Sequence, residues 1–394
     1  MSMLVVNAGS SSLKTVLYDD AQPDLTRLAE YRAANIGQER STLDSWAEGT
    51  EKATITLPLS DHQQALQVIL DTINKSVPTG SIDTIAYRVV YGGKAYYQPT
   101  IITDVVRADL ATFSGIDPEH APVTLAIIDQ LRHLLPDSQH IACFDTAYFH
   151  DIPDVAQIVP IPRAYRDLGI RRFGYHGLSY DYLSDTFGVI AGETARRGRV
   201  IYAHLGSGAS MAATVDGHPV DMTMGVTPVS GLVMGSRTGD IDPGLAWSLA
   251  TQANLSIDQY QHMINHESGL LAVSELSSDM YELIQAQATN PDAALAVELF
   301  CYQARKAIGA LASTINGIDS LVFSGGIGEQ SAEIRRRISE GLSFLGITID
   351  NDANERHDRL ISAPNSQVGV HVIPTDESLS IARSIISMKT KDRQ

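Results

Sequence analysis

Three shortages in the sequence each exclude a class of protein. Only two cysteines occur in 394 residues, Cys143 and Cys301, which excludes a disulfide framework and favours reduced thiols in the cytoplasm. We expect neither secretion nor a membrane span, because no run of 18 apolar residues occurs and no basic segment precedes an apolar one at the N-terminus. With 29 basic against 46 acidic residues, the net charge of −17 argues against binding to nucleic acid or an anionic membrane.

Two nucleotide-binding signatures are also absent. No Gly-x-x-x-x-Gly-Lys-Ser/Thr loop occurs, and the glycines at 325–328 lack the rest of a dinucleotide fingerprint. These absences disfavour a P-loop ATPase and a Rossmann dehydrogenase. A flat glycine turn after a strand can still lie against an adenine ring or a ribose.

A polar turn between two apolar runs is the most informative feature that is present. Residues 4–6 and 13–18 favour strands, and the turn between them contains Gly9 and three serines, followed by Lys14. Glycine permits backbone angles that other residues resist, and the serines and the lysine offer donors to an anion. The pattern predicts a phosphate-holding β-hairpin; a surface hairpin with a serine-rich turn is the alternative.

The same pattern occurs again in the second half of the chain. Residues 200–216 repeat it, with His204 in the position of Asn7 and Gly206 in the position of Gly9. Two such hairpins indicate a duplicated domain. A cleft between the two halves would place the phosphate-holding turns opposite each other.

The remaining sequence alternates strand-like and helix-like segments, which is typical of an α/β protein whose central sheets are covered by helices. We expect two domains, 1–147 with 379–394, and 148–378, because the final apolar helix can fold back on the first domain. The expected strands are 54–58, 82–90, 141–144, 321–323 and 371–373, and the expected helices are 61–75, 122–135, 292–315 and one that Ser331 caps.

In so acidic a chain, an anionic ligand must be held by local cations, so arginines close to glycines are informative. Arg88, Arg172 and Arg237 are such residues. Arg88 can hold a carboxylate or phosphate with two parallel hydrogen bonds, or form an internal salt bridge. Arg237 can act as an arginine finger oriented by Asp240; a surface ion pair is the alternative.

Three further polar residues follow apolar segments or lie beside glycines. Asp145 ends a short strand, where it can orient a magnesium-bound phosphate or cap a turn. His176 and His204 can donate hydrogen bonds to charge that develops on a phosphoryl group, although lone histidines are often structural.

Taken together, the motifs at 7–14, 144–147, 169–177, 234–243 and 326–329 resemble those of the acetokinase family, which is related to actin, hexokinase and the heat-shock chaperone ATPases. The resemblance runs nearly end to end. It implies two duplicated ribonuclease H-like domains with mixed sheets flanked by helices and an active site in the interdomain cleft. It also implies a homodimer that transfers the γ-phosphoryl group of ATP reversibly to acetate, giving acetyl phosphate and ADP, with Mg²⁺ or alternatively Mn²⁺.

The resemblance also implies roles for individual residues. Arg88 would hold the carboxylate, His176 and Arg237 would stabilise the transition state, and Asp145 would be the essential acid. Asn7 and Glu377 would bind the metal. Val90, Tyr175 and Pro228 would line the acyl pocket. The residues expected to contact the ATP phosphates are Ser10, Ser12, Lys14, His204, Leu205, Gly206, Ser207 and Gly208. Those expected at the nucleoside are Asp279, Met280, Tyr281, Gly326, Ile327, Gly328, Glu329 and Gln330.

The chain departs from the family pattern at several of these places. Tyr91 and Tyr180 stand where histidines are usual, and Ser207 and Gln330 where asparagines are. Tyr281 stands in place of an arginine, and the segment 113–120 differs from the family's usual apolar-Pro-Leu-His-Asn-Pro.

These departures leave open the acyl chain and the phosphoryl donor. A kinase for propionate or another short carboxylate is one alternative, and a pyrophosphate-dependent acetate kinase is another. A nucleotide-driven binding or filament protein of the same fold is a third, but it would need no carboxylate clamp. Phosphoryl transfer to a carboxylate suits these residues because the acceptor is already ionised at pH 7. Asp145 would then organise metal and water, and accept no proton.

Overall fold

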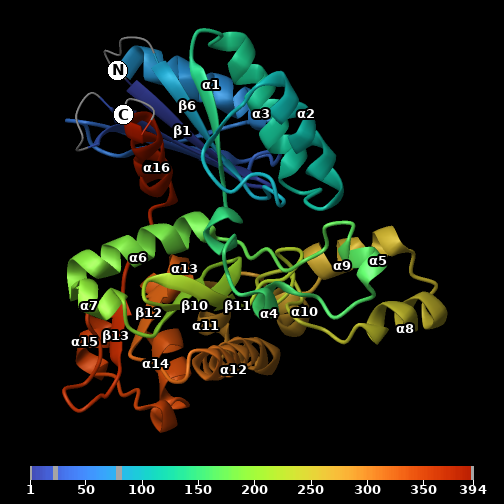
Figure 1. Cartoon of the computed structure of the whole chain (residues 1–394), viewed down its shortest axis with the longest axis vertical. Helices are drawn as coiled ribbons and strands as arrows, with labels where there is room; N and C mark the ends of the chain where they lie inside the picture. The colour runs from blue at the N-terminus through green and yellow to red at the C-terminus, as the bar shows by residue number, and fades with distance from the viewer. Residues whose placement is uncertain (1, 21–24, 77–81, 392–394) are drawn as a thin grey trace. The chain divides into compact units, whose positions relative to one another are not determined.

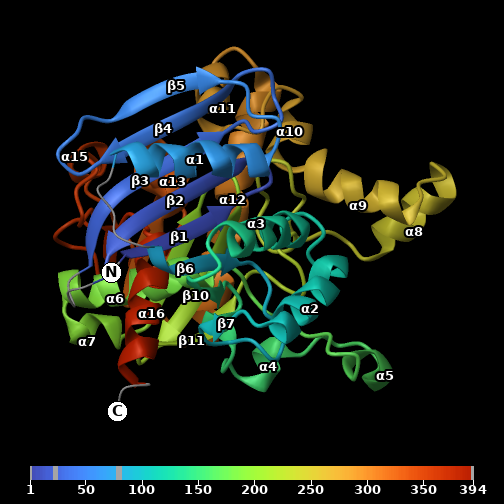
Figure 2. The ribbon, with the colours of Figure 1, turned by 90° about the horizontal axis from the view of Figure 1, so that it is seen from above.

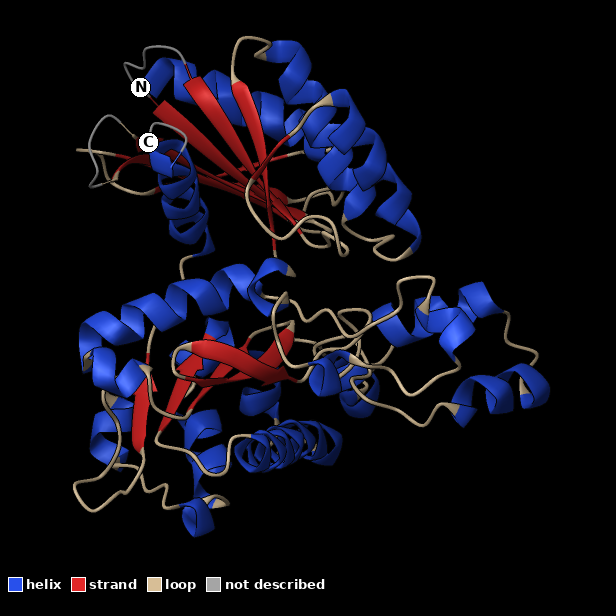
Figure 3. Cartoon of the chain, viewed as in Figure 1, coloured by secondary structure: helices blue, strands red, loops and turns tan. Residues whose placement is uncertain are grey.

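The structure is a computed structural model that describes residues 2–20, 25–76 and 82–391. It divides into two compact units, residues 1–147 with 376–394 and residues 148–375. Each unit contains a mixed sheet flanked by helices, which confirms the expected α/β class (Figure 3). The first unit includes residues 376–378, which the sequence places with the second domain.

The first unit is built on an eight-stranded sheet in the order β5-β4-β3-β2-β1-β6-β8-β7. The strands β1 to β5 form an antiparallel meander, whereas β1, β6 and β8 are parallel neighbours. The bounds are β1 (Ser2–Ala8), β2 (Ser12–Asp19), β3 (Thr26–Ala34), β4 (Ser41–Ala47), β5 (Ala53–Leu57), β6 (Ile82–Val89), β7 (Thr100–Ile101) and β8 (Gln139–Phe144).

Helices cover both faces of this sheet (Figures 1 and 2). On one face α1 (His62–Ser76) and α3 (Ala121–Leu134) pack on the strands and on each other, with α2 (Asp104–Thr112) beside α3. Buried aliphatic residues from the sheet and the two helices, including Leu4, Ile69 and Ile128, form one core. The last helix, α16 (Glu377–Lys391), lies on β1 and β6, so the expected return of the C-terminal helix to the first domain is present.

The second unit repeats part of this arrangement. Its sheet has the order β11-β10-β9-β12-β13, with β11, β10 and β9 antiparallel and β9, β12 and β13 parallel. The strands β3-β2-β1-β6-β8 of the first unit have the same order and directions, as a duplicated domain requires. The bounds are β9 (Val200–Leu205), β10 (Ala209–Val215), β11 (His218–Met222), β12 (Ser320–Ser324) and β13 (Gly369–Val372).

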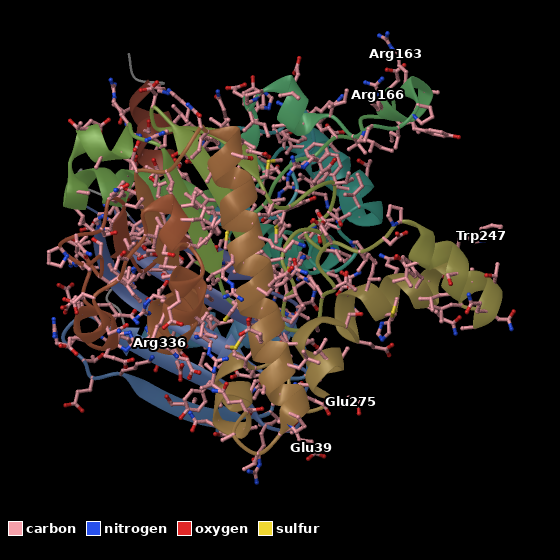
Figure 4. The ribbon with its side chains drawn as sticks, turned by 90° about the horizontal axis from the view of Figure 1, so that it is seen from below. Glu39, Arg163, Arg166, Trp247, Glu275 and Arg336 are labelled. Atoms are coloured by element: carbon pink, nitrogen blue, oxygen red, sulfur yellow. The ribbon has the colours of Figure 1, made fainter. Side chains whose placement is uncertain are left out.

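Two long helices cover the second sheet. The helix α6 (Gly177–Ala191) packs Tyr180, Leu183 and Phe187 on one face, and α12 (Pro291–Thr314) contacts β9, β10 and β11 and crosses the sheet in Figure 4. The other helices are α4 (Asp154–Gln157), α5 (Arg163–Arg166), α7 (Glu193–Arg196), α8 (Gly244–Gln252), α9 (Ile257–His266), α10 (Gly269–Ser274), α11 (Met280–Ala286), α13 (Gly325–Gln330), α14 (Ala332–Glu340) and α15 (Asn351–Glu355). Among the described residues, no helix is long and apolar enough to cross a membrane.

The expected glycine turn at 326–328 is instead a short helix, α13, that begins directly after β12. Gly325 starts it with φ of +75°, and a Cβ there would lie 2.6 Å from the carbonyl oxygen of Leu205. Only glycine fits a backbone that is both left-handed and this close to β9. The glycines therefore let α13 pack against the end of β9.

A buried arginine anchors α13 from behind. The side chain of Arg335 is fully buried, and its guanidinium donates to the carbonyl oxygens of Gly328, Glu329 and Asn354 and to Oδ1 of Asn354. Burial lowers the pKa of Arg335 to about 10, and the more distant Glu355 only partly offsets that effect. The cation is therefore held by neutral acceptors, two of them carbonyl oxygens of the helix that it anchors and two of them on Asn354 of α15.

We predict that Arg335→Met lowers the free energy of unfolding by about 3 kcal/mol, because buried carbonyl oxygens lose their donors. The matched control is Arg336→Met, whose side chain is partly exposed and pairs with Glu340 one turn away, so it should cost less than about 0.5 kcal/mol. Urea unfolding followed by circular dichroism measures both. Equal losses for the two variants would contradict the anchoring role.

Candidate functional site

The first unit gathers polar side chains at one edge of its sheet. The strands β1, β6 and β8 are parallel neighbours, so their carboxyl ends meet at the same edge. Asn7 lies near the end of β1, Arg88 near the end of β6, and Asp145 directly after β8. Glu377 joins them because it is the first residue of α16, which packs on β1 and β6.

These four residues form one hydrogen-bonded cluster. Nε and Nη2 of Arg88 donate to the carboxylate of Asp145 at 3.1 and 2.6 Å, and Nη1 donates to Oδ1 of Asn7 at 3.1 Å. Nδ2 of Asn7 donates to Oε2 of Glu377 at 2.9 Å, and the same Oε2 lies 3.5 Å from Nε of Arg88. Arg88 thus forms the internal salt bridge that was its alternative interpretation.

That salt bridge leaves Arg88 able to bind a further anion. A guanidinium has five N–H groups, and Asp145 and Asn7 take three of them. One N–H remains on each Nη, and both are donors that an anion accepts. The side chain keeps 16% of its surface exposed, whereas that of Asp145 keeps 1%.

The charges in this cluster depend on one another. Burial by itself would lower the pKa of Arg88, but the carboxylates of Asp145 and Glu377 raise it above its ordinary value. Burial raises the pKa of Asp145, while the Arg88 guanidinium opposes that rise. Arg88 is therefore a permanent cation, and its charge favours the ionised form of Asp145 against the effect of burial.

A buried acid and histidine beside this cluster were not singled out as functional in the sequence. Asp117, 3% exposed, lies 2.8 Å from Nδ1 of His120, and both residues act electrostatically on the Arg88–Asp145 pair. They belong to the segment 113–120 that departs from the family pattern, and that departure is the only signal that could have found them. A small cavity lined by Val90, Tyr91 and Phe113 reaches Asp117.

The hairpin between β1 and β2 forms as expected, but Gly9 acts differently from the prediction. Its φ is not positive, and a Cβ there would lie 2.7 Å from Oγ of Ser12, so that hydroxyl would have to move. The turn is closed by the bond from the Gly9 N–H to the Ser12 carbonyl oxygen. Ser10 is exposed and Ser12 half-buried. Nζ of Lys14 lies 3.1 Å from Glu30, so the lysine is paired on β2 and β3.

The second unit brings the two histidines together. His176 is the N-cap of α6, in a left-handed conformation with φ of 60°, and its ring stacks on that of His204 at the end of β9, with centroids 4.4 Å apart. Nδ1 of His176 lies 2.9 Å from Oγ of Ser210, and Nδ1 of His204 lies 2.8 Å from Oγ of Ser179. A left-handed non-glycine residue is costly, and such strain is common at functional sites.

Arg237 approaches the same place from the loop before α8. A Cβ added at Gly208 would lie 3.5 Å from Nε2 of His176 and 3.6 Å from Nη1 of Arg237. An imidazole nitrogen and a guanidinium nitrogen therefore converge on the turn between β9 and β10. Nη1 of Arg237 lies 3.5 Å from the carbonyl oxygen of Pro228 and 3.9 Å from the sulfur of Met234, and Asp240 accepts a hydrogen bond from the backbone N–H of Gly231.

Neighbouring segments support this turn. The N–H of Gly206 donates to the carbonyl oxygen of Gly208, as Gly9 does to Ser12 in the first hairpin, and Gly235 donates to the carbonyl oxygen of Ser207. Ser207 is exposed and Leu205 is buried. On the other side, Oε1 of Glu329 accepts from the N–H groups of Gly325 and Thr375, which ties α13 to the end of β13.

The other residues expected at the nucleoside have mixed placements. Oδ1 of Asp279 caps α11 by accepting from the N–H groups of Tyr281 and Glu282. Met280 is buried, and Tyr281 is 72% exposed. Gly326 and Gln330 are exposed on α13, Ile327 is half-buried, and Gly328 is buried.

The residues expected in the acyl pocket, and Arg172, lie in different parts of the fold. The hydroxyl of Tyr175 donates to the carbonyl oxygen of Val226, two residues before Pro228. This bond links the segment of Tyr175 to the loop that contains Pro228, and both residues are expected in the acyl pocket. Val90 is buried in the first unit. Arg172 binds Asp221 and backbone oxygens of Ala156 and Met222, which makes it a structural link between a loop and β11.

Comparison with known proteins gives one consistent result. Residues 2–383 match the acetokinase family. The acetate kinase of Rhodopseudomonas palustris (strain TIE-1) is 39% identical over 388 residues, which cover 97% of each chain. The propionate kinase of Citrobacter rodentium (strain ICC168) is also 39% identical, over 98% of this chain and 96% of its own. The acetate kinase structure of Porphyromonas gingivalis is similar with a TM-score of 0.86 at 34% identity, covering 98% of this chain and 99% of that chain.

The chain belongs to the acetokinase family. The resemblance drawn from the motifs is thereby confirmed, and so is the expectation of an enzyme, because the family consists of phosphotransferases. The family membership does not decide the acyl substrate, since an acetate kinase and a propionate kinase each share 39% sequence identity with this acetokinase.

We predict that Arg88→Met lowers the free energy of unfolding of the first unit of this acetokinase by about 3 kcal/mol, because the buried Asp145 loses its counter-ion. The double variant Arg88→Met/Asp145→Asn should cost clearly less than the sum of the single variants. Fluorescence of Trp46 on β4 reports this unit during urea unfolding when Trp247 is replaced by Phe.

The control for this cycle is Arg107→Met. Arg107 pairs with Asp129 in a half-exposed contact, so its loss should cost less than about 1 kcal/mol. Strictly additive costs for Arg88 and Asp145 would show that the two side chains do not depend on each other.

Proposed function

We propose that this acetokinase is an acetate kinase that transfers the γ-phosphoryl group of ATP reversibly to acetate, giving acetyl phosphate and ADP. The convergence of His176 and Arg237 on the glycine turn at Gly208 carries the proposal. A transferring phosphoryl group spreads charge over three oxygens, and two fixed donors beside backbone N–H groups suit that charge. The family membership of the chain supports the same reaction.

In this proposal the acceptor binds to the first unit. The two remaining N–H groups of Arg88 would hold the acetate carboxylate, which is ionised at pH 7 and needs no general base. One carboxylate oxygen would form the bond to the γ-phosphorus as the bond from that phosphorus to the ADP oxygen breaks. The buried pair with Asp145 would keep Arg88 in place, so Asp145 acts as an organiser and not as a base.

The residues present fit a magnesium site of the kind that nucleotide enzymes use. Among the described residues, no three His, Cys, Asp or Glu side chains are placed to hold a metal ion together. Mg²⁺ is commonly bound through one or two protein oxygens, with phosphates and water completing its shell. Asn7 and Glu377, already hydrogen-bonded to each other, offer such oxygens. Mg²⁺ would neutralise charge on the phosphates; Mn²⁺ is the alternative ion.

The turn at 204–208, Ser10, Ser12 and Lys14 would contact the phosphates of ATP, and α13 with Asp279 would lie at the nucleoside. Two observations favour alternatives. The equal identity to a propionate kinase keeps a longer acyl chain open. The exposed Tyr281, where the family pattern has an arginine, keeps pyrophosphate open as the donor.

We predict acyl phosphate, trapped as the hydroxamate, from acetate with ATP and Mg²⁺. The same assay with propionate and butyrate, and with pyrophosphate as the donor, tests the alternatives.

Arg237→Ala should lower kcat by about a hundredfold or more with little change in the KM for acetate, since it removes a donor to the transition state. Chelation of the metal should abolish the product.

Arg336→Ala, a surface change, is the matched control and should keep full activity. Product only with another acid or donor would reassign the substrate. No product in any combination would refute phosphotransferase activity and favour a nucleotide-driven binding protein.

We also propose that the enzyme is a cytoplasmic homodimer joined through the second unit. The helix α8 has no charged residue, and none of its nine residues is buried. Trp247 on α8 is 76% exposed, and Ile257 on α9 is 75% exposed. The side chain of Trp247 points away from the ribbon in Figure 4. Exposed apolar surface of this kind is usually covered by a partner, and a second copy is the partner that the family resemblance implies. Both cysteines are buried thiols, which supports a reducing compartment.

We predict that the wild-type protein sediments as a dimer and that Trp247→Glu sediments as a monomer, because a charge would be buried in an apolar contact. Analytical ultracentrifugation measures this. Val189→Glu replaces a similarly exposed apolar residue, on α6, and should leave the dimer intact. A dimer in all three proteins would exclude α8 as the contact.

A further inference from the structure

Two serines of the second unit hold the stacked histidines, and one of them has a second partner. Oγ of Ser210 lies 2.9 Å from Nδ1 of His176 and 2.5 Å from the hydroxyl of Tyr180. Tyr180 lies one turn after His176 on α6, so the two side chains reach β10 from the same side of the helix. The three side chains form a hydrogen-bonded chain from Tyr180 through Ser210 to His176.

One direction of donation through these two bonds satisfies all three groups. Burial raises the pKa of Tyr180 above its ordinary value, so the phenol keeps its proton. The one proton of that phenol can point to Oγ of Ser210, 2.5 Å away, which makes Tyr180 the donor. The hydroxyl of Ser210 carries one proton, and with Tyr180 donating to it that proton is directed to Nδ1 of His176. Nδ1 then accepts, and a neutral imidazole must carry its proton on Nε2.

We propose that Tyr180 is a positioning residue that acts through Ser210 to hold His176 as the neutral imidazole with its proton on Nε2. The Nε2 atom is the one that faces Gly208 together with Nη1 of Arg237. The relay therefore supplies a donor at the glycine turn. Its role in phosphoryl transfer rests on the proposed function, whereas the proton position does not.

The charged and titratable groups around His176 agree with a neutral ring. The ring of His204, from β9, stacks on it, and the cation of Arg237, from the loop before α8, converges on the same glycine. A positive charge on His176 would be opposed by the nearby cation of Arg237. Stabilising the neutral tautomer by hydrogen bonds therefore avoids a repulsion that an imidazolium would meet.

This arrangement also explains one departure from the family pattern. Tyr180 stands where acetokinases usually have a histidine, which could present either a donor or an acceptor to Ser210. A phenol held in its protonated form by burial has a single proton, and in the proposed relay that proton points to the serine.

The test is the tautomer of His176, read from the ¹⁵N shifts of its two ring nitrogens in histidine-labelled protein at neutral pH. The His176→Gln variant assigns the signals. We expect Nε2–H in the wild type and both tautomers in Tyr180→Phe and in Ser210→Ala, because the proton of Nδ1 is no longer excluded. Tyr148→Phe is the matched control: its ring lies in the same aromatic cluster, 6.0 Å from that of Tyr180, and its hydroxyl is not bonded to Ser210.

Kinetics supply the second measurement. Tyr180→Phe should lower kcat by about three- to tenfold, the size of one lost hydrogen bond, with both KM values unchanged within about twofold. The combined loss in Tyr180→Phe/Ser210→Ala should be no larger than that in Ser210→Ala, because the two act in series. Tyr148→Phe should match the wild type.

The outcomes separate the relay from the proposed function. A wild-type His176 with its proton on Nδ1, or a Tyr180→Phe variant that retains only the Nε2–H tautomer, would overturn the relay. The Nε2–H tautomer in a protein without phosphotransferase activity would keep the relay and refute the proposed function. Unchanged kcat in a Tyr180→Phe protein whose tautomers have mixed would refute the positioning role.

Discussion

The ion pair between Arg88 and Asp145 is the interaction on which the first unit's polar cluster depends. A carboxylate that is 1% exposed is tolerated only beside a cation, and a largely buried guanidinium needs acceptors. Asp145 satisfies one side of the guanidinium, which orients the rest toward Asn7 and Glu377. Two N–H groups remain as donors, so the same charge that stabilises the fold is available to an anion.

Parallel strand pairing explains why polar residues collect where they do in both units. The strands β1, β6 and β8 end together, as do β9, β12 and β13, and the residues after them lie on one edge of each sheet. One edge carries the Arg88 cluster and the other carries His204, α13 and Thr375. Open sheets of this kind usually bind ligands at the carboxyl ends of their strands. The duplication therefore gives each unit a candidate site by the same geometry.

The second unit uses strain and neutral hydrogen bonds where the first uses charge. His176 has a left-handed backbone and is held by Ser210, and Arg335 binds carbonyl oxygens of α13 without a close carboxylate. Such groups hold their geometry only while the surrounding packing is intact. The glycine turn at 206–208 is consequently fixed from several directions before any ligand binds.

The sequence by itself determined the α/β class, the two hairpins, most of the long helices and strands, and the family, because these follow from local periodicity and from motifs of adjacent residues. It placed Arg88, Asp145, His176 and Arg237 among the chemically important residues but could not choose between salt bridge and ligand for Arg88. Only the tertiary structure decided that Arg88 binds Asp145, 57 positions later. It also showed that Ser210 links His176 to Tyr180 and that Asp117 pairs with His120 beside the cluster. Finally, it showed that the glycines after β12 begin a helix. The physical reason is that these contacts depend on strand register and on packing between distant segments, neither of which a single sequence shows.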